Sequence, residues 1–247
     1  SAMANTRDSR TRPRAEPLAA EGEAGAGRPA TVLVHAAGTL GDAMLHRVSD
    51  HDVDEVLDSH LGVAIQLSRA MAGAIRSTGG RIVYVGGAAG LVGSVGQAAH
   101  AAAKAGLFGI TGAVALEMAG RDVCVNYLVP FAFTRMTESI PPVTDKLREY
   151  LDSAPMATAD DIAPVAVWLC SPAATGITGQ VVGARGAAIT LWSQPRPAIE
   201  LVEPAGWDLR TLTTTAGPAL AELLTPLESE FDLFGEAPHA VAAREAP

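Results

Sequence analysis

The sequence predicts an α/β fold in which a parallel β-sheet is covered by helices on both faces. Short β-branched segments alternate with longer helical segments from residue 31 to residue 183, and this alternation is typical of parallel sheets with crossover helices. The strand-like segments are apolar at nearly every position, as strands buried on both faces are. Apolar residues make up 48% of the chain and aromatic residues only 4%, so we expect a largely aliphatic core.

Two strands and one long helix are expected in the first part of this fold. Residues 31–35 form a short apolar run that predicts a buried strand. A helix is expected over about 52–76, because apolar residues recur there at helical spacing. Gly79 and Gly80 end this helix, and residues 81–85 form the next strand.

The second part opens with a glycine-rich loop, residues 86–96, and then alternates again between helices and strands. The first of these helices is long and rich in Ala. The expected elements are a helix over about 97–118, a strand over 123–129, helical segments over roughly 143–153 and 159–170, and a strand over 179–183.

The chain divides into three parts by composition. Residues 1–30 lack a steady hydrophobic period and are expected to be a mobile tail, with an arm that packs on a partner as the alternative. Residues 31–197 form the α/β domain. Residues 198–247 are punctuated by proline and amphipathic, and we expect an extension packed on the domain.

Charge and cysteine content exclude several classes of partner. The net charge is −9 and no basic run lies beyond the N-terminal tail, so nucleic acid and anionic membranes are poor partners. We find no apolar stretch of about 18 residues and expect no membrane span. Cys124 and Cys170 lie in apolar runs, which favours buried free thiols in a reducing cytoplasm.

Five short motifs follow one another along the chain. They are Leu-Val-His-Ala-Ala-Gly at 33–38, Val-Leu-Asp-Ser-His-Leu at 56–61, Val-Tyr-Val-Gly-Gly-Ala-Ala-Gly at 83–90, His-Ala-Ala-Ala-Lys at 100–104 and Ile-Thr-Gly-Gln-Val at 177–181. By the order and spacing of these motifs, the chain from about Val32 to Val182 is similar to the C-terminal two thirds of a short-chain dehydrogenase/reductase. The resemblance implies a Rossmann-like three-layer fold.

Finer features resemble one branch of that family. The segments 130–137, 167–170 and 192–197 are similar to those of 3-hydroxyacyl-thioester dehydrogenases and 3-oxoacyl reductases. The resemblance implies an acyl thioester or a polyketide-like β-keto chain as substrate class, an implication that rests on analogy of fold. In that branch a histidine often replaces the family's helix asparagine, so His60 at this position does not by itself indicate a loss of function.

The first departure from the family concerns the cofactor. The resemblance implies roughly eighty residues before the position of His35, with three strands and the Gly-rich turn that seats a pyrophosphate. Only thirty-four residues precede His35, and none resembles Thr-Gly-x-x-x-Gly-x-Gly. We therefore expect a truncated fold, a parallel sheet lacking the family's first three strands, and no bound cofactor.

The second and third departures concern the catalytic side chains. Gly87 stands where the family has its catalytic serine, and Ser94, seven residues on, could swing in. His100 stands at the family's tyrosine, four residues before Lys104 on one helix face. An imidazole has a pKa near ~6.5, and a neighbouring ammonium lowers it. A neutral His100 suits a general base better than the acid that a carbonyl reduction needs.

Three histidines, His35, His60 and His100, fall at positions that line the family's active-site cleft. Two interpretations are open. The histidines are substitutions tolerated after catalysis was lost, or they form a new acid/base site for dehydration, isomerisation or cyclisation. Three imidazoles could also suit zinc, but no carboxylate second shell is evident in the sequence, and we expect no metal. Phe131 replaces a small residue beside the family's nicotinamide slot, where it crowds the slot or fills core space. Thr134 stands at the hydroxyl that holds the nicotinamide carboxamide in the family.

Loss of the first strands would make residues 31–34 an edge strand, which needs a cover. The helices at 52–76 and 97–118 correspond to the pair that builds the family's dimer interface. Three functions follow: a non-catalytic subunit that pairs with an intact relative, or with itself, through these helices; a cofactor-independent enzyme; and a ketoreductase whose partner supplies the cofactor half. In the second, His100 is the general base, Lys104 its electrostatic support and His60 its hydrogen-bond partner.

Overall fold

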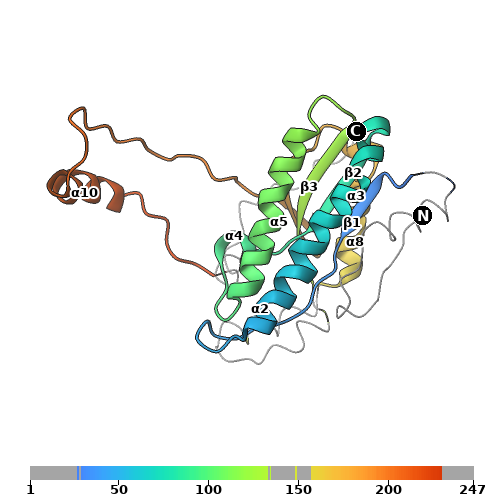
Figure 1. Ribbon diagram of the computed structural model, residues 1–247, viewed down its shortest axis with the longest axis horizontal. Helices are drawn as coiled ribbons and strands as arrows, with labels where there is room; N and C mark the ends of the chain where they lie inside the picture. Colours follow the sequence, from blue (N-terminus) through green and yellow to red (C-terminus); the bar gives the residue numbers. More distant parts are fainter. Residues whose placement is uncertain (1–26, 28, 133, 135–147, 149–156, 230–247) are drawn as a thin grey trace.

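The computed structural model describes residues 27, 29–132, 134, 148 and 157–229. It contains a five-stranded sheet whose strands follow one another in chain order across the sheet (Figure 1). The first four strands are parallel, and the fifth runs antiparallel to the fourth. The strands are β1 (Val32–His35), β2 (Gly80–Val85), β3 (Val123–Phe131), β4 (Val181–Arg185) and β5 (Ala188–Leu191).

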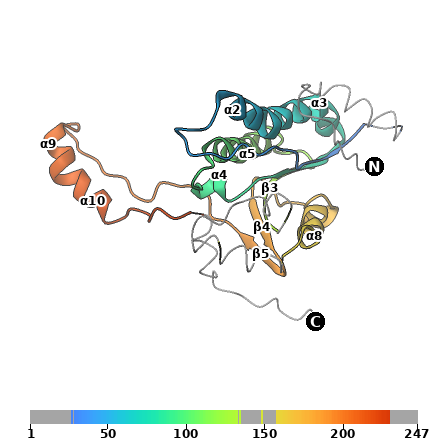
Figure 2. The same ribbon diagram turned by 90° about the horizontal axis from the view of Figure 1, so that it is seen from below.

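Helices cover both faces of the sheet, as Figure 2 shows. Three helices and a π-helical turn, η1, lie on one face, and α8 lies on the other, so the expected three-layer Rossmann-like fold is confirmed. The short helix α4 lies in the loop after β2. The bounds are α2 (Asp50–Leu57), η1 (Asp58–Gly62), α3 (Val63–Thr78), α4 (Ala89–Val92), α5 (Ala98–Glu117) and α8 (Ala159–Leu169).

The core is divided between the two faces because side chains alternate along each strand. Leu33, Ile82 and Tyr127 belong to the larger cluster, together with residues of α3 and α5. Val83 and Leu128 belong to a second cluster with the buried residues of α8. Both clusters meet the strands of the centre of the sheet, which explains why β2 and β3 are buried at nearly every position.

Two expectations about the elements need correction. The helix expected as continuous over 52–76 begins at Asp50, because the Ser49 hydroxyl caps it by accepting a hydrogen bond from the Asp52 amide. The turn η1 then interrupts the helix. β5 was not expected at all. It follows β4 through a tight turn in which Gly186 adopts a positive φ of 50°, a backbone conformation that glycine adopts without steric cost.

The strand β1 lies at one edge of the sheet and pairs only with β2 among the described residues. Its alternate side chains Val32 and Val34 are 49% and 46% exposed. They point to the same face as α8, which covers the sheet only further along. The expectation of an apolar edge strand therefore agrees with the described part of the chain.

The helix α5 corrects the expectation about long apolar stretches. By length and composition alone it could cross a membrane, with a mean hydropathy of 1.3 over its 18-residue window. The core helix of a soluble protein passes the same test. α5 packs on β3 and contributes Ala103 and Leu107 to the core, so we describe it as a helix of the domain.

The expectation that the extension packs on the domain is not met by its described part. Residues 198–229, called the C-terminal arm below, project away from the sheet and its helices in both views (Figures 1 and 2). Pro195 and Pro197 precede the arm and favour extended backbone where it leaves the domain. Most of the N-terminal segment 1–30, and nearly all of the helix expected over 143–153, lie outside the described residues.

Candidate functional site

The candidate site lies where β1 and β2 end and α5 begins. His35 is the last residue of β1, and Gly87 is the second residue after the end of β2. His60 lies in the turn η1, and His100 and Lys104 lie one turn apart near the start of α5. The carboxyl ends of parallel strands are where α/β folds bind ligands. The structure thus brings together all of the side chains that the sequence singled out for catalysis.

Two hydrogen bonds fix His35 and His60. The Nε2 atom of His35 lies 2.7 Å from the carbonyl oxygen of His60, and the Nε2 atom of His60 lies 2.9 Å from that of Thr39. A carbonyl oxygen only accepts, so each Nε2 carries a proton and donates it. Both side chains are 2% exposed. Gly38 leaves room for this arrangement, because a Cβ atom there would overlap the His60 ring.

His60 and His100 face each other directly. Their ring centroids lie 5.0 Å apart with an interplanar angle of 83°. The Nδ1 atoms of both rings are buried and have no hydrogen-bond partner among the described residues. Since the His60 proton is on Nε2, its Nδ1 is a lone-pair acceptor. In the tautomer with its proton on Nδ1, His100 has its lone pair on Nε2.

Burial sets the protonation states of this cluster. It lowers the pKa of His60 to about 3, and the Lys104 ammonium adds to the effect. Burial, followed by Lys104, also lowers the pKa of His100, while Asp42 acts in the opposite direction. The pKa of His35 is lowered mainly by burial as well. These three histidines are therefore neutral near pH 7.

Lys104 is a buried amine with one clear partner. Its Nζ atom donates to the carbonyl oxygen of Val85 over 2.9 Å, and the residue is 6% exposed. Burial lowers its pKa to about 8, so the amine is still mostly protonated near pH 7. Lys104 therefore supplies the positive charge of a site that is otherwise made of neutral imidazoles.

Gly87 occupies the position from which a side chain would enter the site. A Cβ atom added there would lie 3.8 Å from Cγ of Lys104 and 3.9 Å from Nε2 of His100, which are ordinary van der Waals contacts. The position is therefore open to a serine but holds no hydroxyl. The nitrogen of the His100 ring nearest to this position is Nε2.

Tyr127 is a site residue that the sequence did not reveal. Its hydroxyl donates to the carbonyl oxygen of Gly87 and accepts the amide of the same residue, both over 2.9 Å. The side chain is fully buried on β3. A tyrosine within a buried apolar strand resembles an ordinary core residue, so the sequence carries no signal for this contact.

The other candidate positions contribute less. Ser94 lies half-buried in the loop before α5, where its carbonyl oxygen accepts the Gln97 amide. Phe131 is 7% exposed and packs in the larger core cluster, which favours the interpretation that it fills core space. Thr134 is exposed. Within the described part of the chain, no group of three or more His, Cys, Asp or Glu side chains is placed to hold a metal ion.

A family model described as Enoyl-(Acyl carrier protein) reductase matches residues 13–186. The chain belongs to the short-chain dehydrogenase/reductase superfamily. It is 35% identical over 160 residues to the 3-oxoacyl-[acyl-carrier-protein] reductase FabG of Vibrio harveyi, across 63% of this chain and 65% of that protein. It is 34% identical over 178 residues to the (3R)-3-hydroxyacyl-CoA dehydrogenase of Mus musculus, across 70% of this chain and 69% of that protein.

A solved structure supports the same assignment. The crystal structure of a short chain dehydrogenase from Mycobacterium avium superposes with a TM-score of 0.72 at 31% identity, covering 90% of this chain and 73% of that chain. The relatives place this member of the superfamily nearest the 3-oxoacyl reductase branch, as the sequence motifs suggested. The chain spans about two thirds of the length of the curated relatives it matches (65% for the Vibrio protein).

Proposed function

We propose that this short-chain dehydrogenase/reductase does not reduce substrates with NAD(P)H on its own. It serves instead as the non-catalytic subunit of a heteromeric complex with an intact relative that acts on acyl-thioester or polyketide-like substrates. One observation carries the proposal. The fold around the site is retained, yet Gly87 offers no hydroxyl and His100 offers an imidazole with a lowered pKa where the family has a phenol.

The residues of the site do not suit a nicotinamide cofactor reaction. Reduction of a carbonyl needs an acid that protonates the developing alkoxide. Neutral His100 is a poor acid, Gly87 has no hydroxyl, and the Lys104 amine donates to the carbonyl oxygen of Val85. We therefore derive no step through a nicotinamide cofactor.

The surfaces for a partner are the apolar edge of β1 and the helices α2, α3 and α5. β1 leaves backbone donors and acceptors unpaired within the described residues, which is a template for strand addition. α5 exposes Leu116 at 79%. Acidic net charge and free cysteines suit a complex in the cytoplasm that binds neither nucleic acid nor membrane.

Co-expression with an intact relative and native mass measurement tests the proposal. A complex that contains both chains, and in which the intact chain is more active or more stable than alone, is the expected result. A stable homo-oligomer that ignores the relative contradicts it. NADPH binding that appears only in the complex would instead favour a ketoreductase whose cofactor half comes from the partner.

A second candidate function is a cofactor-independent acid/base reaction on the same substrate class. The observation that favours it is the edge-to-face contact of His100 with His60, together with the position of His100 Nε2 beside the open space at Gly87. In the tautomer with its proton on Nδ1, His100 has a lone pair on Nε2 that can take a proton. His100 would take a proton, Lys104 would stabilise the resulting anion, and His60 would hold His100 in the required tautomer. Such a base removes the proton of an acidic C–H group next to a thioester carbonyl.

Substitution His100→Ala tests this second function. We expect a loss of dehydration, isomerisation or cyclisation of at least about 10²-fold, the usual contribution of a positioned general base. His46→Ala, at an exposed histidine outside the site, is the matched control and should keep full turnover. Full activity of the His100 variant contradicts the assignment.

A further inference from the structure

The C-terminal arm exposes a helix without a cover. Its regular part runs continuously from Leu209 to Ala221 through α9 (Leu209–Thr211), the π-helical turn η4 (Leu212–Ala216) and α10 (Gly217–Ala221). These elements contact one another rather than the sheet or its helices, and both views show them standing clear of the domain (Figures 1 and 2).

The apolar side chains of the arm are too exposed for a segment that functions alone. Leu209 is 81% exposed, Leu224 73% and Leu227 fully exposed, while Ala216 is the only buried residue among the described residues of the arm. Isolated helices shorter than about 12–15 residues are marginal in water. A helix of this length with uncovered leucines therefore needs a surface to pack on.

The charge of the arm identifies the kind of surface. Between residues 198 and 229 the arm has one basic residue, Arg210, and five acidic residues. The acidic residues are Glu200, Glu203, Asp208, Glu222 and Glu228. The complementary surface must combine apolar area with positive charge, in a chain whose own net charge is −9.

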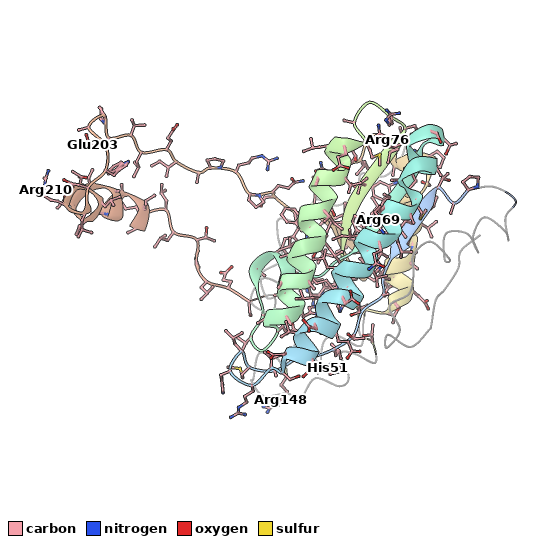
Figure 3. The ribbon with its side chains drawn as sticks, in the orientation of Figure 1. His51, Arg69, Arg76, Arg148, Glu203 and Arg210 are labelled. Carbon is pink, nitrogen blue, oxygen red and sulfur yellow. The ribbon has the colours of Figure 1, made fainter. Side chains whose placement is uncertain are left out.

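The helix α3 offers that combination. It has two arginines, Arg69 and Arg76, and no acidic residue. Both arginines are exposed and lie along one side of the helix (Figure 3), with Ile65 46% exposed on the same side. Arg121 is also exposed. It lies beside the end of α3, where it donates to the carbonyl oxygen of Arg76.

We propose that the C-terminal arm packs on the α3 surface of a second copy of this chain. In Figure 3 the arm, with Glu203 and Arg210, lies far from the α3 of its own domain, so the α3 of a second copy would supply the basic and apolar surface. The arm's leucines then cover Ile65 and its neighbours, and its acidic residues pair with the arginines. This assembly is independent of whether the site catalyses a reaction.

Photo-crosslinking of the full chain tests the proposal. A photoreactive amino acid replaces Leu209, and isotopically light and heavy protein are mixed before irradiation. Links between light and heavy chains that map to α3 are the expected result. Links confined to single chains, or no link to α3, overturn it.

Two variants separate packing from misfolding. Leu220→Asp with Leu224→Asp should weaken self-association by at least about tenfold, because buried leucines lose their apolar contact. The melting temperature of the domain should stay unchanged, since the arm is outside its core. Val167→Asp, at a 69% exposed position on α8, is the matched control and should leave the dimer intact. A dimer that survives the double substitution contradicts the proposal.

Discussion

At the scale of single residues, Tyr127 and two adjacent glycines define the floor of the candidate site. The hydroxyl of Tyr127 holds both backbone groups of Gly87. Its ring occupies the space beside Gly86, where an added Cβ atom would overlap it. The lack of a side chain therefore has a different consequence at each glycine: Gly86 makes room for the Tyr127 ring, and Gly87 leaves the site open.

This difference predicts opposite outcomes for two neighbouring substitutions. Gly86→Ala should reduce the free energy of unfolding by about 1–3 kcal/mol or more, because it forces the Tyr127 ring to move. Gly87→Ala should change it by less than about 1 kcal/mol, because the backbone there has no positive φ and the space is free. Urea denaturation measures both. Equal losses for the two variants would show that the Tyr127 contact is not as described.

The buried histidines predict a loss of stability in acid. The folded protein holds the pKa of His60 at about 3, whereas the unfolded chain titrates near ~6.5. At a pH between these two pKa values, His60 binds a proton in the unfolded chain but stays neutral in the folded protein. The stability contributed by neutral His60 is therefore complete above about pH 6.5 and is lost as the pH falls toward about 3.

Denaturation at a series of pH values checks this expectation. The free energy of unfolding should fall by up to about 1.4 kcal/mol per pH unit for each buried histidine below about pH 6.5. His60→Asn should make the profile shallower, since asparagine does not titrate. The same substitution at exposed His46 should leave it unchanged. An identical profile for wild type and His60→Asn would mean that His60 is solvated in the folded protein.

Several residues of the site could be predicted from the sequence because they belong to motifs with fixed spacing. His100 and Lys104 are four apart on a helix, so their common face followed from helix geometry. The contact between His60 and His100 depended on how η1 and α5 pack, which periodicity does not encode. Tyr127 was missed because an aromatic residue in an apolar strand is usually a core residue, and nothing in the sequence distinguishes Tyr127 from one.

At the scale of elements, the sheet edge at β1 has the clearest functional consequence. Val32 and Val34 alternate with buried Leu33 and His35, so one strand both supports the site and presents an apolar edge that pairs with no further strand among the described residues. The resemblance to the family implied this edge, because the family's first three strands have no counterpart in the sequence. The sequence did not predict β5 at the opposite edge, because that strand is short and depends on the turn at Gly186.

A charge on β1 should block the partner without unfolding the domain. Val34→Lys places an ammonium at a position that is 46% exposed, and charged edge residues oppose strand addition. We expect native mass spectrometry to show loss of the complex with the intact relative. The free energy of unfolding should change by less than about 0.5 kcal/mol, as for most surface substitutions. Ile189→Lys on β5, 61% exposed, is the control; equal loss of binding there would assign the interface to the other edge.

The helices show where prediction from periodicity ends. The amphipathic pattern located α5, α8 and the C-terminal end of α3 to within a few residues. It did not reveal η1, because one extra residue in a helical turn leaves the hydrophobic period nearly unchanged. That turn places the His60 carbonyl against His35, so the missed detail is the one that shapes the site.

At the scale of the whole molecule, the fold superposes on that of a short chain dehydrogenase with a TM-score of 0.72, over 73% of that chain. Gly87 and His100 stand at the positions that the sequence motifs match to the family's serine and tyrosine. The sequence predicted an arm packed on the domain, whereas Leu209, Leu224 and Leu227 of the arm are exposed. Hydrophobic pattern reveals that a segment needs a surface but not which molecule provides it.

The central claim is that the chain alone does not transfer hydride. The most direct test is NADPH oxidation by the purified chain with a 3-oxoacyl thioester, followed by absorbance beside an intact 3-oxoacyl reductase. We expect no oxidation above the rate without protein, and no gain from Gly87→Ser combined with His100→Tyr unless the intact relative is present. Substrate-dependent NADPH oxidation by the wild-type chain alone, abolished by His100→Ala, would contradict the account.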